Sequence, residues 1–419
     1  MRLASPRLPV TALALGLLAL AGGLLGGCGK GAHVQPALGG PQRTLTPITP
    51  EGAVSLATRN TTRLGGADVA TDAAGIARTA YPGLTAATRP QAVVLVDARN
   101  WPAALAASAL AGAPLGAPLL YSEGNSLPAV TQQTLRALSP LGASTLGGAQ
   151  VIRVATSATV PKGDLVRALP KAGPAVLAAA VERLLVTADG GKAPHQAIVV
   201  SASAPRALTM PAAGLAAESG APILFVTPGR VPTATAHVLA SMHRPSIYVV
   251  DPAGIGSSAM SELGHYGAVT PIAPSAGEGT GAAANAVTVA RFTDGTFGWG
   301  VKEPGHGLVF ANAGRPLDAP AAAIMSATGD YGPLLLLETP TQIPGGLSRY
   351  LGDIQPGYTA ATRPVKGIYN HGWLIGDESA VSAVTQAELD SLLEIAEREE
   401  APEEASESQA EQPLPTGER

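Results

Sequence analysis

The sequence of 419 residues has little of three things: cysteine, aromatic residues and net charge. Its single cysteine excludes an intrachain disulfide and any metal or iron–sulfur centre that needs several thiolates. Aromatic residues make up 4% of the chain, too few for a platform on which single-stranded nucleic acid stacks. The formal net charge is −4, whereas an electrostatic nucleic-acid binder carries a basic patch or stripe. No nucleic-acid partner is therefore predicted.

Catalytic motifs are missing as well. The chain has no HExxH zinc helix, no Gly-x-Ser-x-Gly nucleophile elbow and no Gly-Lys-Ser/Thr phosphate loop. Residues 277–282 fit a loose dinucleotide fingerprint, but no strong β-type run leads into them, and a connecting turn is the better interpretation. The pair Asp377-Glu378 is expected to cap the final helix, with a cation site as the alternative. We predict no catalytic residues, no metal, no cofactor and no enzymatic activity.

What is present begins at the N-terminus. Arg2 and Arg7 form a basic head, an apolar run follows over residues 10–25, and small residues precede Cys28. This order resembles a bacterial lipobox, in which the cysteine becomes the lipidated N-terminus. We predict a lipoprotein signal peptide at 1–28 and a protein anchored on the extracytoplasmic face of the cell membrane through Cys28. An ordinary signal peptide or an uncleaved anchor helix is the alternative.

Two further segments flank the body of the chain. Residues 29–53 are rich in Gly, Pro and Thr and are predicted to form a flexible linker. Residues 397–419 hold eight acidic and two basic residues and are predicted to form a disordered acidic tail. Without the signal peptide and this tail, the chain has 23 basic and 23 acidic residues. Anion binding by this neutral body would have to come from local geometry.

The body itself contains three copies of one sequence repeat, with a period of about 105 to 110 residues. Each copy has two apolar β-type runs that start 23 or 24 residues apart, and a proline opens the second run. The paired runs are residues 93–96 with 117–120, 198–200 with 221–224, and 308–310 with 332–335. This separation fits a crossover helix between parallel strands.

Further helices and strands complete the unit. An amphipathic helix is expected before each copy, near residues 67–80, 174–186 and 281–291. A second helix is expected to start at Pro128, Pro232 and Pro344, and a third β-type run follows at 144–148, 247–250 and 373–376. The sequence therefore predicts an α/β protein of three tandem layered repeats with mainly parallel sheets. Their bounds are 54–160, 161–273 and 274–396.

The opening of the first copy, Arg63-Leu64-Gly65-Gly66-Ala67-Asp68, resembles the Arg-Ile-x-Gly-x-Asp/Asn element of the type-2 cell-wall-binding repeat of Gram-positive surface proteins. The Ala-Pro-Leu-Leu and Ala-Pro-Ile-Leu runs, the downstream prolines and Gly147-Gly148 add to the resemblance, which covers roughly residues 54–396. It implies three α/β units packed around a pseudo-threefold axis. It also implies non-covalent attachment to anionic wall polymers.

Each copy carries an arginine in the loop after its first strand: Arg99, Arg206 and Arg315. Such loops lie at the carboxyl ends of parallel strands, where ligands bind in α/β sheets, and next to helix N-termini, which favour anions. These arginines are candidates for binding an anion or an anionic polymer. The alternative is a structural pair with a neighbour such as Asp97 or Asp318, or a contact between repeats.

Together these observations predict a lipid-anchored cell-surface protein of the cell envelope that binds wall polymer through three repeats. Two alternatives remain open. One is a membrane-tethered scaffold that binds a protein partner, and the other is an envelope hydrolase.

Overall fold

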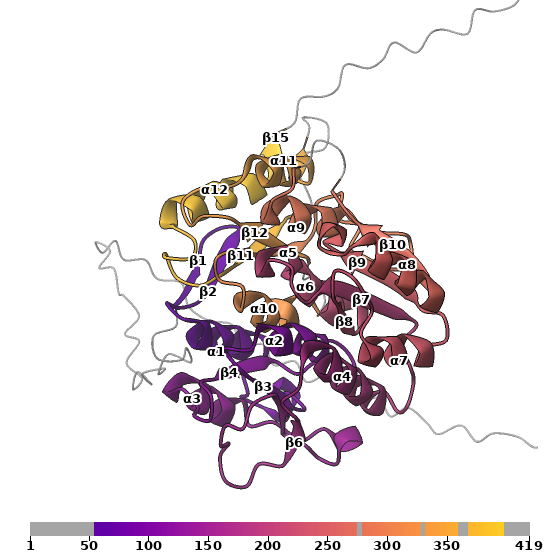
Figure 1. Ribbon diagram of the computed structural model, residues 1–419. Helices are drawn as coiled ribbons and strands as arrows, with labels where there is room; N and C mark the ends of the chain where they lie inside the picture. The colour runs from indigo at the N-terminus through magenta and orange to yellow at the C-terminus, as the bar shows by residue number, and fades with distance from the viewer. Residues whose placement is uncertain (1–53, 275–278, 328–331, 359–367, 398–419) are drawn as a thin grey trace, which may run out of the picture. The chain divides into compact units, whose positions relative to one another are not determined.

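The computed structural model describes residues 54–274, 279–327, 332–358 and 368–397 (Figure 1). The predicted signal peptide with Cys28, the linker and the tail after Glu397 lie outside these residues. Within the described part of the chain, no helix is long and apolar enough to cross a bilayer. The strands form three main sheets, each surrounded by helices, so the predicted α/β class with mainly parallel sheets is confirmed.

The first sheet has the strand order β4-β3-β5-β6, and all its pairs are parallel. Its strands are β3 (Val93–Asp97), β4 (Leu119–Ser122), β5 (Val151–Val154) and β6 (Val166–Leu169). The helical segments of this region are α1 (Val69–Ala80), η1 (Ala86–Thr88), α2 (Trp101–Ala107), η2 (Ser108–Ala111), α3 (Ala129–Leu138) and η3 (Ser144–Leu146).

The second sheet repeats this arrangement in the order β10-β9-β7-β8, again with parallel pairs only. Its strands are β7 (Gln196–Ser201), β8 (Ile223–Val226), β9 (Ser246–Val250) and β10 (Ala268–Ile272). The helical segments are α4 (Pro174–Ala188), α5 (Arg206–Thr209), α6 (Pro211–Ser219), α7 (Thr233–Ser241), η4 (Pro252–Gly254) and α8 (Ser257–Tyr266).

The third sheet, in the order β1-β2-β14-β11-β12, combines strands from both ends of the described chain. Its strands are β1 (Val54–Ala57), β2 (Thr61–Gly65), β11 (Gly307–Asn312), β12 (Leu334–Leu337) and β14 (His371–Ile375). Only the β1–β2 pair in this sheet is antiparallel. The remaining elements are α9 (Ala282–Arg291), α10 (Asp318–Ser326), α11 (Gly345–Asp353) and α12 (Ala383–Leu393), with β13 (Gly357–Tyr358) paired to β15 (Ala396–Glu397).

The strand before each copy's first long helix is donated to another copy's sheet. β6 precedes α4 yet joins the first sheet, and β10 precedes α9 yet joins the second sheet. β2, which precedes α1, pairs with β14 of the third sheet and so links the first copy to the last. Sheets and sequence segments therefore have different bounds: the segment 54–160 gives β2 to the third sheet, and the segment 161–273 gives β6 to the first.

Prolines mark the same points in all three copies, as the sequence predicts. Pro118, Pro222 and Pro333 stand directly before the second strands, where a residue without a backbone N–H is tolerated. Their carbonyls accept from Val94, Ile198 and Val309 at 2.9, 3.0 and 3.1 Å, so the register is the same each time. The downstream prolines Pro128, Pro232 and Pro344 are the N-caps of α3, α7 and α11, which confirms the predicted helix starts.

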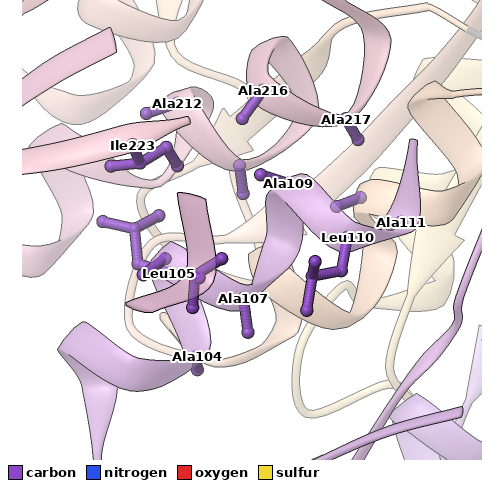
Figure 2. Packing of buried hydrophobic residues seen from close by; sticks show 14 of the residues in the cluster. Ala104, Leu105, Ala107, Ala109, Leu110, Ala111, Ala212, Ala216, Ala217 and Ile223 are labelled. Carbon is purple, nitrogen blue, oxygen red and sulfur yellow. The ribbon is translucent and has the colours of Figure 1, made fainter. Parts of the chain in front are cut away.

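The centre of the core is made by the helices that follow the first strand of each copy. The α2–η2 segment, α6 and α10 contact one another pairwise, as a packing of three equivalent units requires. Their facing side chains are mostly alanines, which let helix backbones approach closely; Figure 2 shows Ala109 on the side of its segment toward Ala216 and Ala217. A Cβ on Gly112 would overlap the carbonyl oxygen of Ala217, so only glycine fits there.

One predicted strand is wrong. Residues 144–148 of the first copy form the 3₁₀ turn η3 and a left-handed turn, and the third strand is β5, a few residues later. Gly147 and Gly148 have φ of 70° and 79°, a backbone conformation that cannot continue a β-strand. The charged Arg153 interrupts the apolar pattern of β5, which is why the run over 144–148 was the stronger signal.

Candidate functional site

Each main sheet has a point where the strand order reverses beside its first strand, and loops meet there at the carboxyl edge. We call these loops loop cluster 1, 2 and 3. Loop cluster 1 is residues 97–100 after β3 with 155–158 after β5. Loop cluster 2 is residues 201–206 after β7 with 251–254 after β9. Loop cluster 3 is residues 312–318 after β11 with 376–380 after β14.

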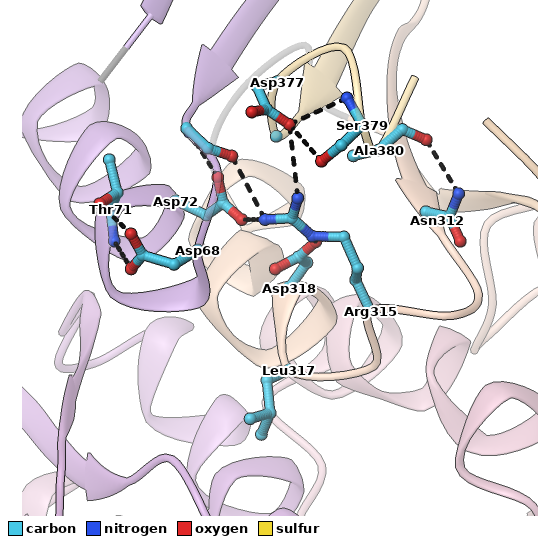
Figure 3. A network of polar contacts seen from close by, with 12 residues as sticks. Asp68, Thr71, Asp72, Asn312, Arg315, Leu317, Asp318, Asp377, Ser379 and Ala380 are labelled. Carbon is cyan, nitrogen blue, oxygen red and sulfur yellow. Dashed lines mark hydrogen bonds and ion pairs between the residues drawn. The ribbon is translucent and has the colours of Figure 1, made fainter. Parts of the chain in front are cut away.

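Arg315 in loop cluster 3 is held by acidic side chains from three elements (Figure 3). Its guanidinium forms ion pairs with Asp72 of α1, with Asp318 at 3.1 Å and with Asp377 at 3.7 Å. It also donates to the Gly66 carbonyl at 3.3 Å. The Asp72 and Asp318 side chains are 0% and 1% exposed, and the Arg315 side chain is 20% exposed. The predicted alternative for Arg315, a structural pair with Asp318, is therefore present.

The two buried carboxyl groups of loop cluster 3 are hard to ionise together. Burial raises the pKa of Asp72 to about 6, although the charge of Arg315 opposes this shift. Burial, and then the neighbouring Asp72 charge, raises the pKa of Asp318 well above its ordinary value. Because like charges at this range disfavour one another, the pair keeps a proton under mildly acidic conditions. One guanidinium thus neutralises the charge that remains.

Asp377 does not cap the final helix, so that prediction is wrong. Its Oδ1 accepts from the Ser379 backbone N–H at 3.0 Å and from the Ser379 hydroxyl at 2.5 Å, while Ser382 caps α12. The capping position lies five residues further along the chain than the acidic pair suggested. As for the cation alternative, no group of His, Cys, Asp and Glu side chains suited to a metal ion occurs among the described residues.

Arg99 in loop cluster 1 pairs with the last residue of its own strand. Its Nη2 and Nε lie 2.8 and 3.0 Å from the two carboxylate oxygens of Asp97, and this hydrogen-bonded guanidinium lowers the pKa of Asp97 to about 2. The Arg99 side chain is nevertheless 74% exposed. The hydroxyls of Ser122 and Thr156 share a hydrogen bond of 2.7 Å, which ties the end of β4 to the loop after β5.

Loop cluster 2 has no such pairing. Arg206 begins α5, is exposed, and forms no ion pair with any described residue. Asp251, directly after β9, is 8% exposed, and its Oδ2 is buried without a hydrogen-bond partner among the described residues. Burial raises the pKa of this carboxyl. The hydroxyls of Ser201 and Ser203 lie 3.2 Å apart beside it and bond to each other.

A third set of prolines gives a reference point for comparing the positions of the three arginines. Pro102, Pro211 and Pro320 lie near the start of α2, α6 and α10. Arg206 and Arg315 both stand five residues before their proline, whereas Arg99 stands three before. This spacing is visible in the sequence and separates Arg99 from the other two arginines.

The same alignment identifies why Arg315 is paired and Arg206 is not. Asp318 stands two residues before Pro320, and Thr209 stands two residues before Pro211. Asp72 is the fourth residue of α1, and Asn285 is the fourth residue of α9. The Asn285 amide donates to the Leu208 carbonyl at 2.5 Å, so α9 contacts α5, which Arg206 begins, with a neutral side chain.

The residues that carry the family resemblance have structural roles. Arg63 on β2 is 2% exposed and donates to the Gly376 and Val381 carbonyls at 3.1 and 2.6 Å. It also donates to the side-chain oxygen of Gln386 at 2.9 and 3.0 Å, which fastens β2 to the end of the third copy. Asp68 caps α1 by accepting from the N–H groups of Ala70 and Thr71, both at 3.0 Å.

Comparison with known proteins gives a family for one region and a fold for most of the chain. Residues 63–157 match the cell wall binding domain 2 (CWB2) family. Cwp6 from Clostridium difficile has a similar structure, with a TM-score of 0.58 and 16% identity, over 81% of this chain and 51% of Cwp6. Cwp8 from the same organism is similar with a TM-score of 0.59 and 17% identity, over 80% of this chain and 53% of Cwp8. This chain thus spans about half of either protein. No curated protein sequence matches it.

Proposed function

We propose that this protein binds anionic cell-wall polymer non-covalently through its three α/β copies. The match of residues 63–157 to cell wall binding domain 2 carries this proposal. The strand order of the first sheet recurs in the second and in the parallel part of the third, which supports extending the function to all copies. Arg99 and Arg206 are exposed at the carboxyl edges of their sheets, where an anionic chain has access to them.

Binding without catalysis, metal or cofactor is part of the proposal. At the carboxyl edge of the third sheet, Arg315 forms ion pairs with Asp72, Asp318 and Asp377, an arrangement typical of a structural charge cluster. His371 contacts the Thr62 hydroxyl at 3.0 Å and packs edge-on against Trp373, and its lowered pKa follows from burial. These contacts are typical of a structural histidine.

Anchoring through Cys28 at the extracytoplasmic face is proposed on the order of basic head, apolar run, small residues and cysteine. Replacing Cys28 by serine in the full-length precursor tests it. We expect the wild-type protein to incorporate labelled palmitate and to fractionate with membranes, and the C28S variant to do neither. Membrane association of the unlabelled C28S variant would contradict the anchor and favour an uncleaved apolar helix.

Co-sedimentation with purified cell walls tests the binding function. Walls are used before and after chemical removal of their anionic polymers, with the full chain as ligand. We expect sedimentation with intact walls, a loss of most binding after removal, and weaker binding as salt is raised, because exposed ion pairs are screened. Equal binding to both wall preparations would contradict the polymer and favour a protein partner.

A further inference from the structure

Loop cluster 2 differs from the other two clusters in having charged groups without partners in the described part of the chain. The guanidinium of Arg206 is exposed and forms no ion pair, and the Oδ2 of Asp251, a residue that is 8% exposed, is buried without a hydrogen-bond partner among the described residues. In loop cluster 1 the guanidinium pairs with Asp97, and in loop cluster 3 with three carboxyl groups. A buried carboxylate without a donor is costly, so its retention calls for an explanation.

The backbone at Asp251 does not explain the carboxylate. Asp251 has φ of 54°, and the residues in the same place after the third strands of the other copies, Ala155 and Gly376, also have positive φ of 54° and 95°. Because alanine takes this conformation in the first copy, the position does not require an aspartate. The carboxylate is therefore an addition that is specific to loop cluster 2.

The surroundings of Asp251 place its carboxylate between the two loops of the cluster. Gly254 stands beside it: a Cβ at this glycine would lie 2.9 Å from Oδ2, 3.4 Å from the Cβ of Ala204 and 3.5 Å from the Cβ of Ser201. Ala204 and Ser201 belong to the loop that leads to Arg206. The carboxylate and the guanidinium thus belong to the same carboxyl edge, and they form no ion pair with each other.

We propose that loop cluster 2 is a binding site for an anionic polyhydroxyl unit, whose anionic group binds Arg206 and whose neighbouring hydroxyl donates to Asp251. This inference rests on the proposed function, because it names the part of a wall polymer that this copy recognises. An arginine binds phosphate or carboxylate through charge-assisted hydrogen bonds. A ligand with the anion alone leaves Asp251 without a donor, and a neutral polyol leaves Arg206 without a counter-charge, so both groups are needed.

The experiment uses the full chain and two small probes, glycerol 3-phosphate and inorganic phosphate, measured by calorimetric titration. Three variants are compared: Arg206→Ala, Asp251→Asn and, as a control, Arg167→Ala. Arg167 is an exposed arginine on the edge strand β6, so its removal changes the net charge equally. Asparagine adopts positive φ readily, so Asp251→Asn is expected to fold, and circular dichroism checks this.

We expect wild type to prefer glycerol 3-phosphate over inorganic phosphate, and R206A to lose about tenfold in affinity for both. The D251N variant is expected to bind both probes about equally, because the hydroxyl acceptor is weakened, and R167A is expected to match wild type. Equal affinities of all four proteins, or a preference for glycerol 3-phosphate that survives in D251N, would overturn the inference.

Wall co-sedimentation of the same proteins separates this inference from the proposed function. If wild type, R206A and D251N all bind polymer-bearing walls equally, the polymer function stands and loop cluster 2 is not its site. If the wild-type protein does not bind these walls, the proposed function is contradicted. The titration with the two probes then still decides whether loop cluster 2 is a binding site.

Discussion

Loop clusters 2 and 3 have an arginine at the same distance from a helix proline, yet the two guanidinium groups lie in opposite surroundings. Arg315 is 20% exposed and faces three carboxyl groups, whereas Arg206 is exposed and faces none among the described residues. The difference comes from neighbouring elements: α1 brings Asp72 to Arg315, whereas the residue at the same place in α9, Asn285, is neutral and bonds to the Leu208 carbonyl.

This contrast shows that equivalent loop clusters of the repeat differ: loop cluster 3 makes contacts between copies, and loop cluster 2 does not make the corresponding ion pairs with described residues. Asp72 and Arg315 are 243 residues apart in the sequence, and their ion pair lies where the first copy meets the last. Arg63, nearby on β2, makes its contacts with the same end of the third copy. Loop cluster 3 is therefore a junction that holds the two ends of the described chain together. Loop cluster 2 lies where the chain is continuous, so no such junction is needed there.

The junction should be most sensitive at Arg63. We expect Arg63→Ala to reduce the free energy of unfolding by about 3 to 5 kcal/mol, because it leaves two buried carbonyls and the Gln386 side chain without their donor. Urea denaturation measures the change. The matched control is Arg167→Ala on β6 of the first sheet, for which a change within about 0.5 kcal/mol is expected. Similar losses in both variants would refute the special role of the junction.

The direct comparison of the two clusters is Arg315→Ala against Arg206→Ala. We expect R315A to lose about 3 kcal/mol of stability, because Asp72 and Asp318 stay buried without their counter-charge. R206A should change stability by no more than about 0.5 kcal/mol, since an exposed, unpaired side chain is removed. Urea denaturation of both variants checks this. A destabilised R206A would show that Arg206 has a structural partner.

The contribution of the junction to stability should also depend on pH. Because the folded state keeps a proton on the Asp72–Asp318 pair that the unfolded state releases, this pair favours folding at pH 4 and loses that contribution as pH rises through about 6. Asp318→Asn removes one of the two buried carboxyl groups, so we expect it to reduce this loss, whose slope is at most about 1.4 kcal/mol per pH unit. Urea denaturation between pH 4 and 7 compares the profiles.

Asp97→Asn is the control for this titration. The pKa of Asp97 is lowered to about 2, so its contribution is present above about pH 4 and is lost only as pH falls further. The free energy of unfolding of D97N should therefore change with pH between 4 and 7 in the same way as that of wild type. A D318N profile that is also parallel would mean that the two carboxyl groups do not share a proton.

The smallest expected effects have opposite signs. Asp251→Asn should stabilise the protein by about 1 kcal/mol at pH 7, because a buried charge without a partner is removed. Asp377→Asn should destabilise it by about 0.5 kcal/mol, because this carboxylate accepts hydrogen bonds from Ser379 and faces Arg315. Thermal unfolding resolves such shifts. If D251N is less stable than wild type, Asp251 has a structural donor.

Much of the fold could be predicted from the sequence, because its signals are local. Apolar runs and their prolines gave the first two strands of every copy, and Pro128, Pro232 and Pro344 marked helix starts. The pairs Arg99–Asp97 and Arg315–Asp318 could be anticipated because their members are two and three residues apart. The strand over 144–148 failed because an apolar, Gly-containing run does not reveal positive φ.

The parts that could not be predicted depend on distant segments. No local pattern indicates that β2 pairs with β14, or that Arg63 bonds to Gln386. Asp72 looks like an ordinary first-turn acid of α1, and Asp251 like a turn residue after a strand. Asp72 is buried and paired where the third copy packs against it, and the Oδ2 of Asp251 is buried beside the loop that leads to Arg206.

The amino-acid sequence alone already contained the repeated α/β unit, the neutral body, the single cysteine and an arginine after each first strand. These features follow from the order of residues along the chain, which sets periodicity, turns and local charge. Tertiary packing alone determines that Arg315 also meets a buried carboxyl group from the first copy, and that Arg206 meets none among the described residues. Asp72, which faces the Arg315 guanidinium, comes from another copy, and its burial raises the pKa of its carboxyl group.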